Sequence, residues 1–132
     1  MNDSLLTQTA REELVSACRT TVGDELRSIT FFTDDGLEQV YLRSDLSQTA
    51  DLVGFAEQER LGFRSQQAYR QTQLGEYIAT VRMFEDGYLV RVLDESSGVW
   101  VTADSMSIER FEELASVLKP VLADLEFEPS PD

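Results

Sequence analysis

Two stretches in which apolar and polar residues alternate around an Asp-Gly pair constrain the fold of this chain most strongly. Tyr77–Phe84 and Tyr88–Leu93 flank Asp86-Gly87, and in a strand successive side chains point to opposite faces of the sheet. An Asp-Gly pair between two such runs favours a two-residue hairpin turn. With that turn, Val81 faces Val92 and one face of the hairpin is apolar.

A second hairpin of the same design is predicted earlier in the chain. Arg27–Thr33 and Leu37–Arg43 are joined through Asp34-Asp35-Gly36. If Asp35-Gly36 forms the turn, Phe31 faces Val40, and this hairpin also has one wholly apolar side.

A fifth strand is predicted over Val99–Thr102, after a turn formed by residues 95–98. A four-residue loop at this point sets Trp100 beside Leu93 on the preceding strand. Trp100 then lies on the face of the sheet opposite the apolar one.

Three helices are predicted from apolar residues at helical spacing. The first covers Arg11–Gly23, with Gly23 as its stop signal, and the second covers Asp51–Leu61. Ser107 is a candidate N-cap for the last helix. Pro120 is expected to kink that helix or end it near Lys119.

These elements predict an α+β fold in the order helix-strand-strand-helix-strand-strand-strand-helix. A five-stranded antiparallel sheet with the first and last helices on its apolar face accommodates every hydrophobic run. The expected architecture is a two- or three-layer sandwich. We expect one domain over residues 1–125 and a disordered acidic tail over residues 126–132, which contain Pro129 and Pro131.

The other face of the predicted sheet combines aromatic, aliphatic and arginine side chains and is almost free of acid. This composition is typical of the core of a protein–protein interface. We therefore take this surface, the Arg/aromatic face, as the candidate interaction surface. Its residues are Phe32, Tyr41, Arg43, Arg82, Phe84, Leu89, Arg91, Leu93 and Trp100.

Coverage by the predicted second helix is the structural alternative for the Arg/aromatic face, because a sheet that is apolar on both sides usually needs cover on both. If Arg82 and Arg91 are cross-strand neighbours, they repel each other unless an anion lies nearby. Glu57 and Glu59 of the second helix could supply that anion, and so could another chain.

The residue inventory argues against most catalytic chemistry. The chain has no histidine, which removes the usual base near neutral pH and the imidazole metal ligands. It has neither a GxxxxGKS or GxxxxGKT phosphate loop nor a GxGxxG element. Asp34-Asp35 and Asp94-Glu95 fail the calcium-loop pattern, and Cys18 lies on an apolar helical stripe, where an inert buried thiol is expected. We predict no enzyme and no catalytic, cofactor-binding or metal-binding residues.

Charge indicates where the chain works. It has 25 acidic against 11 basic residues and a formal net charge of −14, and Lys119 is its only lysine. The self-repulsion weakens at about 1 M salt, where the Debye length is roughly 3 Å. A salt-rich halophile cytoplasm is indicated, and an acidic mesophilic protein is the alternative. This charge disfavours nucleic acid and membranes as partners.

Three segments, ELVSACRTTVGDELRSITFF, YLRSDL and GEYIATVRMFEDGYLVRV, resemble a family of small acidic haloarchaeal proteins with no activity attached to it. The order of elements is also similar to that of roadblock, longin and profilin-like domains. This second resemblance implies a non-catalytic dimerising or GTPase-associated module, and it carries over no functional residue.

The leading functional hypothesis is a non-enzymatic protein-interaction or dimerisation module that uses the Arg/aromatic face. The alternative is a small-ligand sensor with a pocket between the sheet and the second helix. An enzyme ranks third, because it would have to rely on carboxylates alone.

Overall fold

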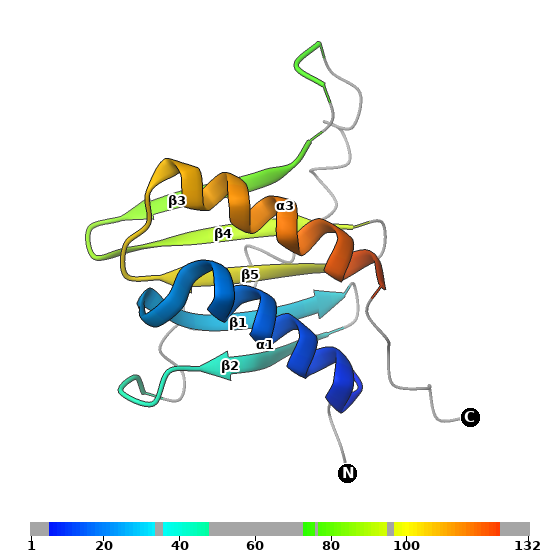
Figure 1. Ribbon diagram of the computed structural model, residues 1–132, viewed down its shortest axis with the longest axis vertical. Helices are drawn as coiled ribbons and strands as arrows, with labels where there is room; N and C mark the ends of the chain where they lie inside the picture. Colours follow the sequence, from blue (N-terminus) through cyan, green and yellow to red (C-terminus); the bar gives the residue numbers. More distant parts are fainter. Residues whose placement is uncertain (1–5, 34–35, 48–72, 76, 95–96, 125–132) are drawn as a thin grey trace.

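A five-stranded antiparallel sheet with two helices on one face forms the computed structural model, which describes residues 6–33, 36–47, 73–75, 77–94 and 97–124 (Figure 1). The strand order is β2-β1-β5-β4-β3. The predicted α+β class is confirmed, whereas the predicted second helix and tail lie outside the described residues. The elements are α1 (Gln8–Val22), the 3-10 helix η1 (Gly23–Glu25), β1 (Leu26–Thr33), β2 (Leu37–Leu42), β3 (Ala79–Phe84), β4 (Gly87–Leu93), β5 (Ser97–Ala103) and α3 (Ile108–Asp124).

Local capping explains where α1 begins and ends. The Thr7 hydroxyl accepts a hydrogen bond from the backbone N–H of Ala10 at 3.1 Å, which satisfies one of the free donors of the first turn. Gly23 follows the last turn with φ of 75°, and its N–H donates to the Arg19 carbonyl. The predicted stop at Gly23 is confirmed.

The last helix, α3, begins as predicted and ends later. The Ser107 hydroxyl accepts from the N–H of Arg110 at 3.3 Å, in agreement with its predicted role as N-cap. The helix then continues through Pro120 to Asp124, so the expected end near Lys119 is wrong. Proline removes one intrahelical hydrogen bond, but Leu122, two residues later, is buried in the core, which favours helix over a break.

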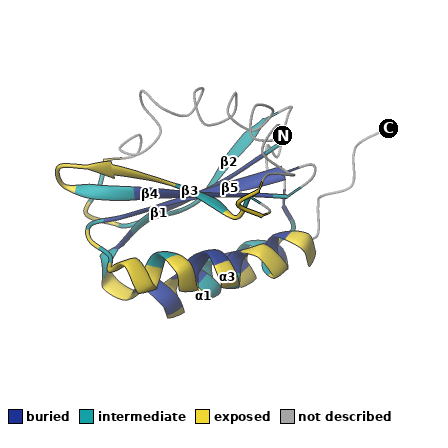
Figure 2. Cartoon of the chain, turned by 90° about the horizontal axis from the view of Figure 1, so that it is seen from above, coloured by how far each residue is buried: buried dark blue, intermediate teal, exposed yellow. Residues whose placement is uncertain are grey.

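α1 and α3 lie side by side over one face of the sheet (Figure 2). Their buried side chains, among them Leu14, Cys18 and Leu118, form one cluster with Phe31 and Val101 from the sheet. Burial raises the pKa of the Cys18 thiol to about 12, so the thiolate form is scarce. The predicted burial of Cys18 is confirmed.

All three hairpins differ in register from the sequence prediction. Thr33 N–H donates to the Gly36 carbonyl at 2.8 Å and Asp94 N–H to the Ser97 carbonyl at 2.8 Å, so two residues lie between the hydrogen-bonded partners in each case. In the remaining hairpin Phe84 pairs with Gly87. The glycines of the Asp-Gly pairs therefore follow the turns instead of occupying them.

The corrected registers change neighbours but leave most faces as predicted. Val81 lies opposite Val90, where Val92 was expected, and Trp100 lies opposite Arg91, where Leu93 was expected. Because side chains alternate with a period of two, a shift of two residues keeps each of them on its face of the sheet.

Close approach of the backbone explains the position of Gly87. A Cβ atom on Gly87 would lie 2.6 Å from the carbonyl oxygen of Ala103 on β5. Gly87 therefore sits at the start of β4 because a neighbouring strand leaves no room for a side chain. The turn propensity of an Asp-Gly pair cannot predict this close approach of another strand.

A β-bulge distinguishes the first hairpin from the other two. Thr30 pairs with Gln39, but Ile29 pairs with Tyr41, so Val40 is the extra residue of β2. The predicted pairing of Phe31 with Val40 is wrong, because Phe31 lies opposite Glu38. Residues of β2 beyond the bulge change faces relative to the prediction.

A smaller core lies on the sheet face opposite the helices. Phe32, Leu89, Leu93 and Trp100 form it, with Leu37 and Tyr77 packed against them. The rings of Phe32 and Trp100 have centroids 5.3 Å apart and a tilt of 36°, a favourable aromatic arrangement. Both faces of the central strands are therefore buried.

Gly98→Ala should destabilise the fold, because a Cβ atom at Gly98 would lie 2.4 Å from Cζ of Phe32 and 2.7 Å from Cδ2 of Leu93. Overpacking of this kind costs about 1–3 kcal/mol. The matched control is Gly36→Ala, since nothing lies within 4 Å of a Cβ atom there. Urea unfolding followed by tryptophan fluorescence measures both variants. Equal stability of the two would contradict this account of the smaller core.

Candidate interaction surface

The nine residues of the predicted Arg/aromatic face do not form one surface. Five of them are at most 7% exposed, so they cannot present a contact area in this structure. The physical reason is that their side chains are packed away from solvent, and aromatic and aliphatic residues in that position form a core. The five buried residues are Phe32, Leu89, Arg91, Leu93 and Trp100.

Arg91 is the unusual member of this buried group, because its side chain carries a charge and is 1% exposed. Its Nη2 donates to the hydroxyl of Thr80, the residue opposite it on β3, at 3.2 Å. The same Thr80 hydroxyl lies 2.5 Å from the hydroxyl of Tyr77. Arg82 lies opposite Leu89, so the predicted direct pairing of Arg82 with Arg91 is wrong.

Tyr41 lies on the helix side of the sheet, and its placement on the Arg/aromatic face is wrong. It packs against the larger core, and the guanidinium carbon of Arg19 on α1 lies 5.9 Å from its ring centroid. The bulge at Val40 is the cause, because one extra residue turns the following side chains to the other face.

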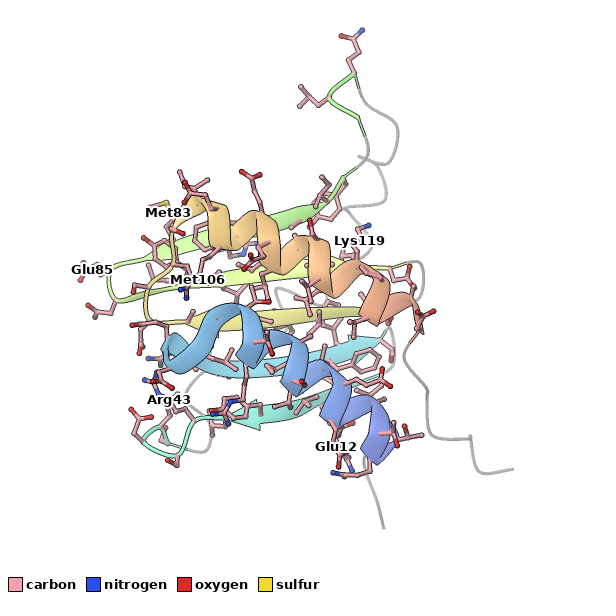
Figure 3. The ribbon with its side chains drawn as sticks, in the orientation of Figure 1. Glu12, Arg43, Met83, Glu85, Met106 and Lys119 are labelled. Carbon is pink, nitrogen blue, oxygen red and sulfur yellow. The ribbon has the colours of Figure 1, made fainter. Side chains whose placement is uncertain are left out.

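Arg43 belongs to an ion-pair network at one end of the sheet (Figure 3). Its Nε lies 2.6 Å from Oδ1 of Asp45, and its Nη1 lies 2.6 Å from Oδ2 of Asp104. Asp104 also pairs with Nη1 of Arg27 at 3.2 Å, and Arg43 donates to the Asp24 carbonyl. Arg43 thus joins segments distant in sequence, which is a structural role.

The network lowers the pKa values of its carboxylates. Hydrogen bonding from Arg43 is the main cause that holds the pKa of Asp104 below its ordinary value of 3.8, and Arg27 adds to it. Hydrogen bonding from Arg43 also lowers the pKa of Asp45. Because these carboxylates are partly exposed, water and salt screen the pairs.

Asp104→Asn should lower the melting temperature near neutral pH, because it removes the carboxylate between two arginines. The folded-state pKa of Asp104 is lowered from 3.8, so its contribution is present above that value and is lost as the pH falls through the folded-state pKa. The difference between wild type and variant should therefore close below about pH 4. Thermal unfolding by circular dichroism at constant KCl measures it.

Asp124→Asn is the control for this pH series, since it removes the same charge from an exposed position at the end of α3. Asp124 forms no ion pair with the described residues. A pH-dependent stability difference of the same size in this variant would show that general charge repulsion, and not the network, causes the effect.

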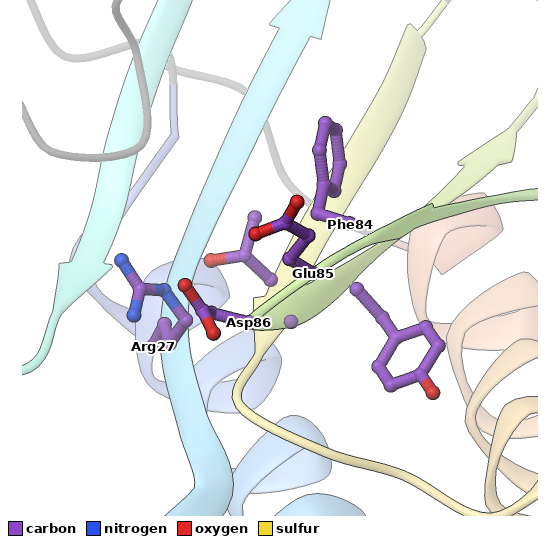
Figure 4. A pocket seen from close by; sticks show the side chains of 7 residues that line it. Arg27, Phe84, Glu85 and Asp86 are labelled. Atoms are coloured by element: carbon purple, nitrogen blue, oxygen red, sulfur yellow. The ribbon is translucent and has the colours of Figure 1, made fainter.

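A cavity of about 360 Å³ lies beside the turn between β3 and β4. Figure 4 shows the carboxylates of Glu85 and Asp86 between Arg27 and the ring of Phe84. Tyr88 and Thr102 complete its wall with Gly87, and the Thr102 hydroxyl is 2.6 Å from that of Ser28.

Metal and membrane sites find no support in the part of the chain that the structure describes. Its cysteine and acidic residues form no group of three or more that could hold a metal ion. Its helices are too short or too polar to cross a membrane.

Exposed apolar side chains lie along the outer edge of β3. We call Ile78 and the strand Ala79–Phe84 the β3 edge. Its large apolar side chains are strongly exposed: Ile78 60%, Val81 41%, Met83 77% and Phe84 53%. Arg82, also exposed, is the only charged residue of this strand. Figure 3 shows Met83 beside the start of α3.

The β3 edge keeps Arg82 and Phe84 of the predicted interface and adds residues that the prediction missed. Val81 and Met83 were assigned to the apolar, helix-covered face. They do lie on that face, but α3 approaches β4 and β5 more closely than β3. No local pattern in the sequence indicates that a helix stops short of an edge strand.

The opposite edge of the sheet, β2, is protected. All six of its residues are at least partly buried, and its ladder is interrupted by the bulge. Glu38 accepts from the N–H of Leu6 at 3.2 Å and pairs with Arg11 of α1 at 2.8 Å. Bulges and covered edges prevent unwanted strand pairing, and β3 has an unbroken register with β4.

A family model described as "Domain of unknown function (DUF7522)" matches residues 12–123. The chain belongs to the DUF7522 family. The matched range of this DUF7522 chain begins in α1 and ends in α3, so it includes every strand of the sheet. No curated protein matches the chain.

Solved structures show that this DUF7522 chain has a roadblock-like fold. The gliding protein MglB from Thermus thermophilus is 12% identical with a TM-score of 0.63, over 94% of this chain and 98% of that one. A structure described as MglB with tetrameric arrangement is 13% identical with a TM-score of 0.63, over 94% of this chain and 98% of that one. MglB from Myxococcus xanthus is 11% identical with a TM-score of 0.56, over 97% of this chain and 99% of that one. At such identities the likeness concerns the fold alone.

Proposed function

We propose that this chain is a non-catalytic protein-interaction module that pairs with a second copy of itself through the β3 edge. The exposure of Val81, Met83 and Phe84 along an edge strand carries the proposal. An exposed, regular and apolar edge strand is a template for pairing with another strand. Partners that add a strand gain main-chain hydrogen bonds and bury the apolar side chains together.

Charge supports a β-strand partner at this position. Ala79–Phe84 contains no acidic residue, although the whole chain carries 25. The edge is therefore a place where two strongly acidic molecules could approach with little direct repulsion. At high salt, screening reduces the remaining long-range repulsion further.

A structural relative supports self-association, because one of the similar MglB structures is described as tetrameric. The absence of histidine from the chain supports a non-catalytic role, since it removes the commonest general base. The nine residues of the Arg/aromatic face are not needed for this proposal, except Arg82 and Phe84.

Met83→Glu should dissociate the dimer. It places a carboxylate in the apolar contact, where an unpaired charge is costly to bury, and we expect the dissociation constant to rise at least about tenfold, or about 1.4 kcal/mol. Met83 is 77% exposed in the single chain, so folding should be preserved, as circular dichroism can check. Light scattering in about 2 M KCl measures the mass.

Ser16→Glu is the matched control for Met83→Glu. Ser16 is exposed on α1, a helix that contacts β1 and β2 at the far side of the sheet, and the substitution adds the same charge. A monomeric wild type over the accessible concentration range would refute the proposal. A Met83→Glu variant as dimeric as wild type would exclude the β3 edge.

We also propose that the module works in the salt-rich cytoplasm of a halophilic archaeon. The net charge of −14 supports this proposal, as do exposed acids on the two adjacent helices. Repulsion between these helices is strongest in dilute buffer, where the Debye length is long. The four acids concerned are Glu12, Glu13, Glu112 and Glu113.

Raising KCl from about 0.1 M to about 2 M should raise the melting temperature by at least about 5 °C, which corresponds to roughly 1 kcal/mol in the free energy of unfolding. A variant with glutamine at positions 12, 13, 112 and 113 should show a smaller rise, because less repulsion remains to be screened. Thermal unfolding by circular dichroism measures both proteins. An identical salt response would contradict electrostatic adaptation of the helix layer.

A further inference from the structure

We propose that the cavity beside the turn between β3 and β4, here the turn cavity, binds a guanidinium group. Its volume of about 360 Å³ lies within the range of small-molecule sites, roughly 300–1,000 Å³. Glu85 and Asp86, which line it, lie in the turn after the last residue of β3. The site is therefore separate from the strand through which self-association is proposed, and it does not depend on that function.

The turn cavity has an excess of negative charge. Figure 4 shows the carboxylates of Glu85 and Asp86 between Arg27 and the ring of Phe84. Neither carboxylate forms an ion pair or a hydrogen bond with the residues that the structure describes. The guanidinium of Arg27, in contrast, lies 3.2 Å from Oδ1 of Asp104. Because the positive charge of the cavity is already balanced, the two carboxylates favour a cation over an anion.

The ring of Phe84 favours an organic cation over a metal ion. This side chain is 53% exposed and lines the turn cavity together with the carboxylates. A cation over the face of an aromatic ring is attracted by it, and the apolar atoms of an organic ligand gain contact as well. Calcium instead takes six or more oxygen ligands. The acidic residues of the described ranges offer no group of three that could hold a metal ion.

Carboxylates beside an aromatic ring suit a guanidinium better than an ammonium. A guanidinium is planar, donates two parallel hydrogen bonds to one carboxylate and stacks on aromatic rings. It is also more weakly hydrated than an ammonium, which matters at an exposed site where ion pairs gain little. Arg43 makes such a paired contact within this chain, because its Nε and Nη2 lie 2.6 and 3.3 Å from the two carboxylate oxygens of Asp45.

A titration with N-acetyl-L-arginine amide tests the site, because this probe carries one guanidinium and no other charge. We expect the backbone amide signals of residues 85–87 to shift in NMR spectra of the full chain, with a millimolar dissociation constant, in about 0.15 M KCl. N-acetyl-L-citrulline amide has the same shape without the charge and should leave these signals in place. N-acetyl-L-lysine amide, an ammonium, should bind more weakly than the arginine probe.

Variants of the cavity wall separate its charge from its ring. Glu85→Gln combined with Asp86→Asn should raise the dissociation constant about fivefold or more, because both carboxylates are lost. Phe84→Leu keeps an apolar side chain and should raise it about two- to fivefold. The matched control is Glu112→Gln combined with Glu113→Gln, which removes two adjacent exposed carboxylates from α3. This control should bind the probe as wild type does.

The source of the guanidinium is decided by two further probes. One is ethylguanidine, a small molecule, and the other is the capped tripeptide Ala-Arg-Ala. Tighter binding of the tripeptide assigns the turn cavity to an arginine side chain of a partner protein. Equal or tighter binding of ethylguanidine assigns it to a free guanidinium compound. Both results support the same recognition chemistry.

Three results would overturn the proposal. Spectra that the arginine probe leaves unchanged, or equal shifts in wild type and the Glu85/Asp86 variant, would exclude the site. Equal binding of the lysine probe would exclude guanidinium as the class of ligand. Light scattering in the same buffer keeps this test independent of self-association, since the Glu85/Asp86 variant should lose binding while keeping the mass of wild type.

Discussion

Burial of β5 on both faces is the constraint on which the rest of the structure depends. All seven residues of Ser97–Ala103 are buried, and β5 lies between β1 and β4 at the centre of the sheet. On one side its valines meet the helices, and on the other Trp100 meets Phe32. A strand buried in this way leaves little space around it. Gly87 therefore approaches it without a side chain, and Gly98 within it leaves room for Phe32 and Leu93.

The charge of the chain is distributed around this buried centre. Acidic residues are exposed on both helices, while Arg43 and Arg27 hold Asp104 at one end of the sheet. Arg91 is the charged residue placed inside, where it bonds Thr80. Arginine suits both positions because its planar group donates several hydrogen bonds in fixed directions. The exposed acids on the two helices are among the charges whose repulsion salt can screen.

The two edges of the sheet differ in a way that determines which of them can meet a partner. β2 is bulged, partly buried and joined to the N-terminal segment through Glu38. β3 is regular and carries exposed apolar residues. Since α3 covers the centre of the sheet more than its β3 side, neither of the two described helices shields Val81 and Met83, which stay exposed. An interaction at this edge would extend the sheet without disturbing either core.

The amino-acid sequence by itself determined the class of the fold, the end of α1 at Gly23, the N-cap of α3 at Ser107, and the face on which most strand residues lie. The start of α1 at Gln8, after Thr7, was not predicted. The features that the sequence determined depend on neighbours within a few residues, such as Ser107 and Gly23 or an alternation with period two. Tertiary structure decided the registers, because a period of two is blind to a shift of two residues. It also decided the bulge at Val40, and with it the side of the sheet on which Tyr41 lies. Tertiary structure also decided that Trp100 is buried and Met83 is exposed, because segments distant in sequence determine which side chains are covered. The candidate site therefore changed from a sheet face, which composition suggested, to a sheet edge, which only the packing of α3 leaves open.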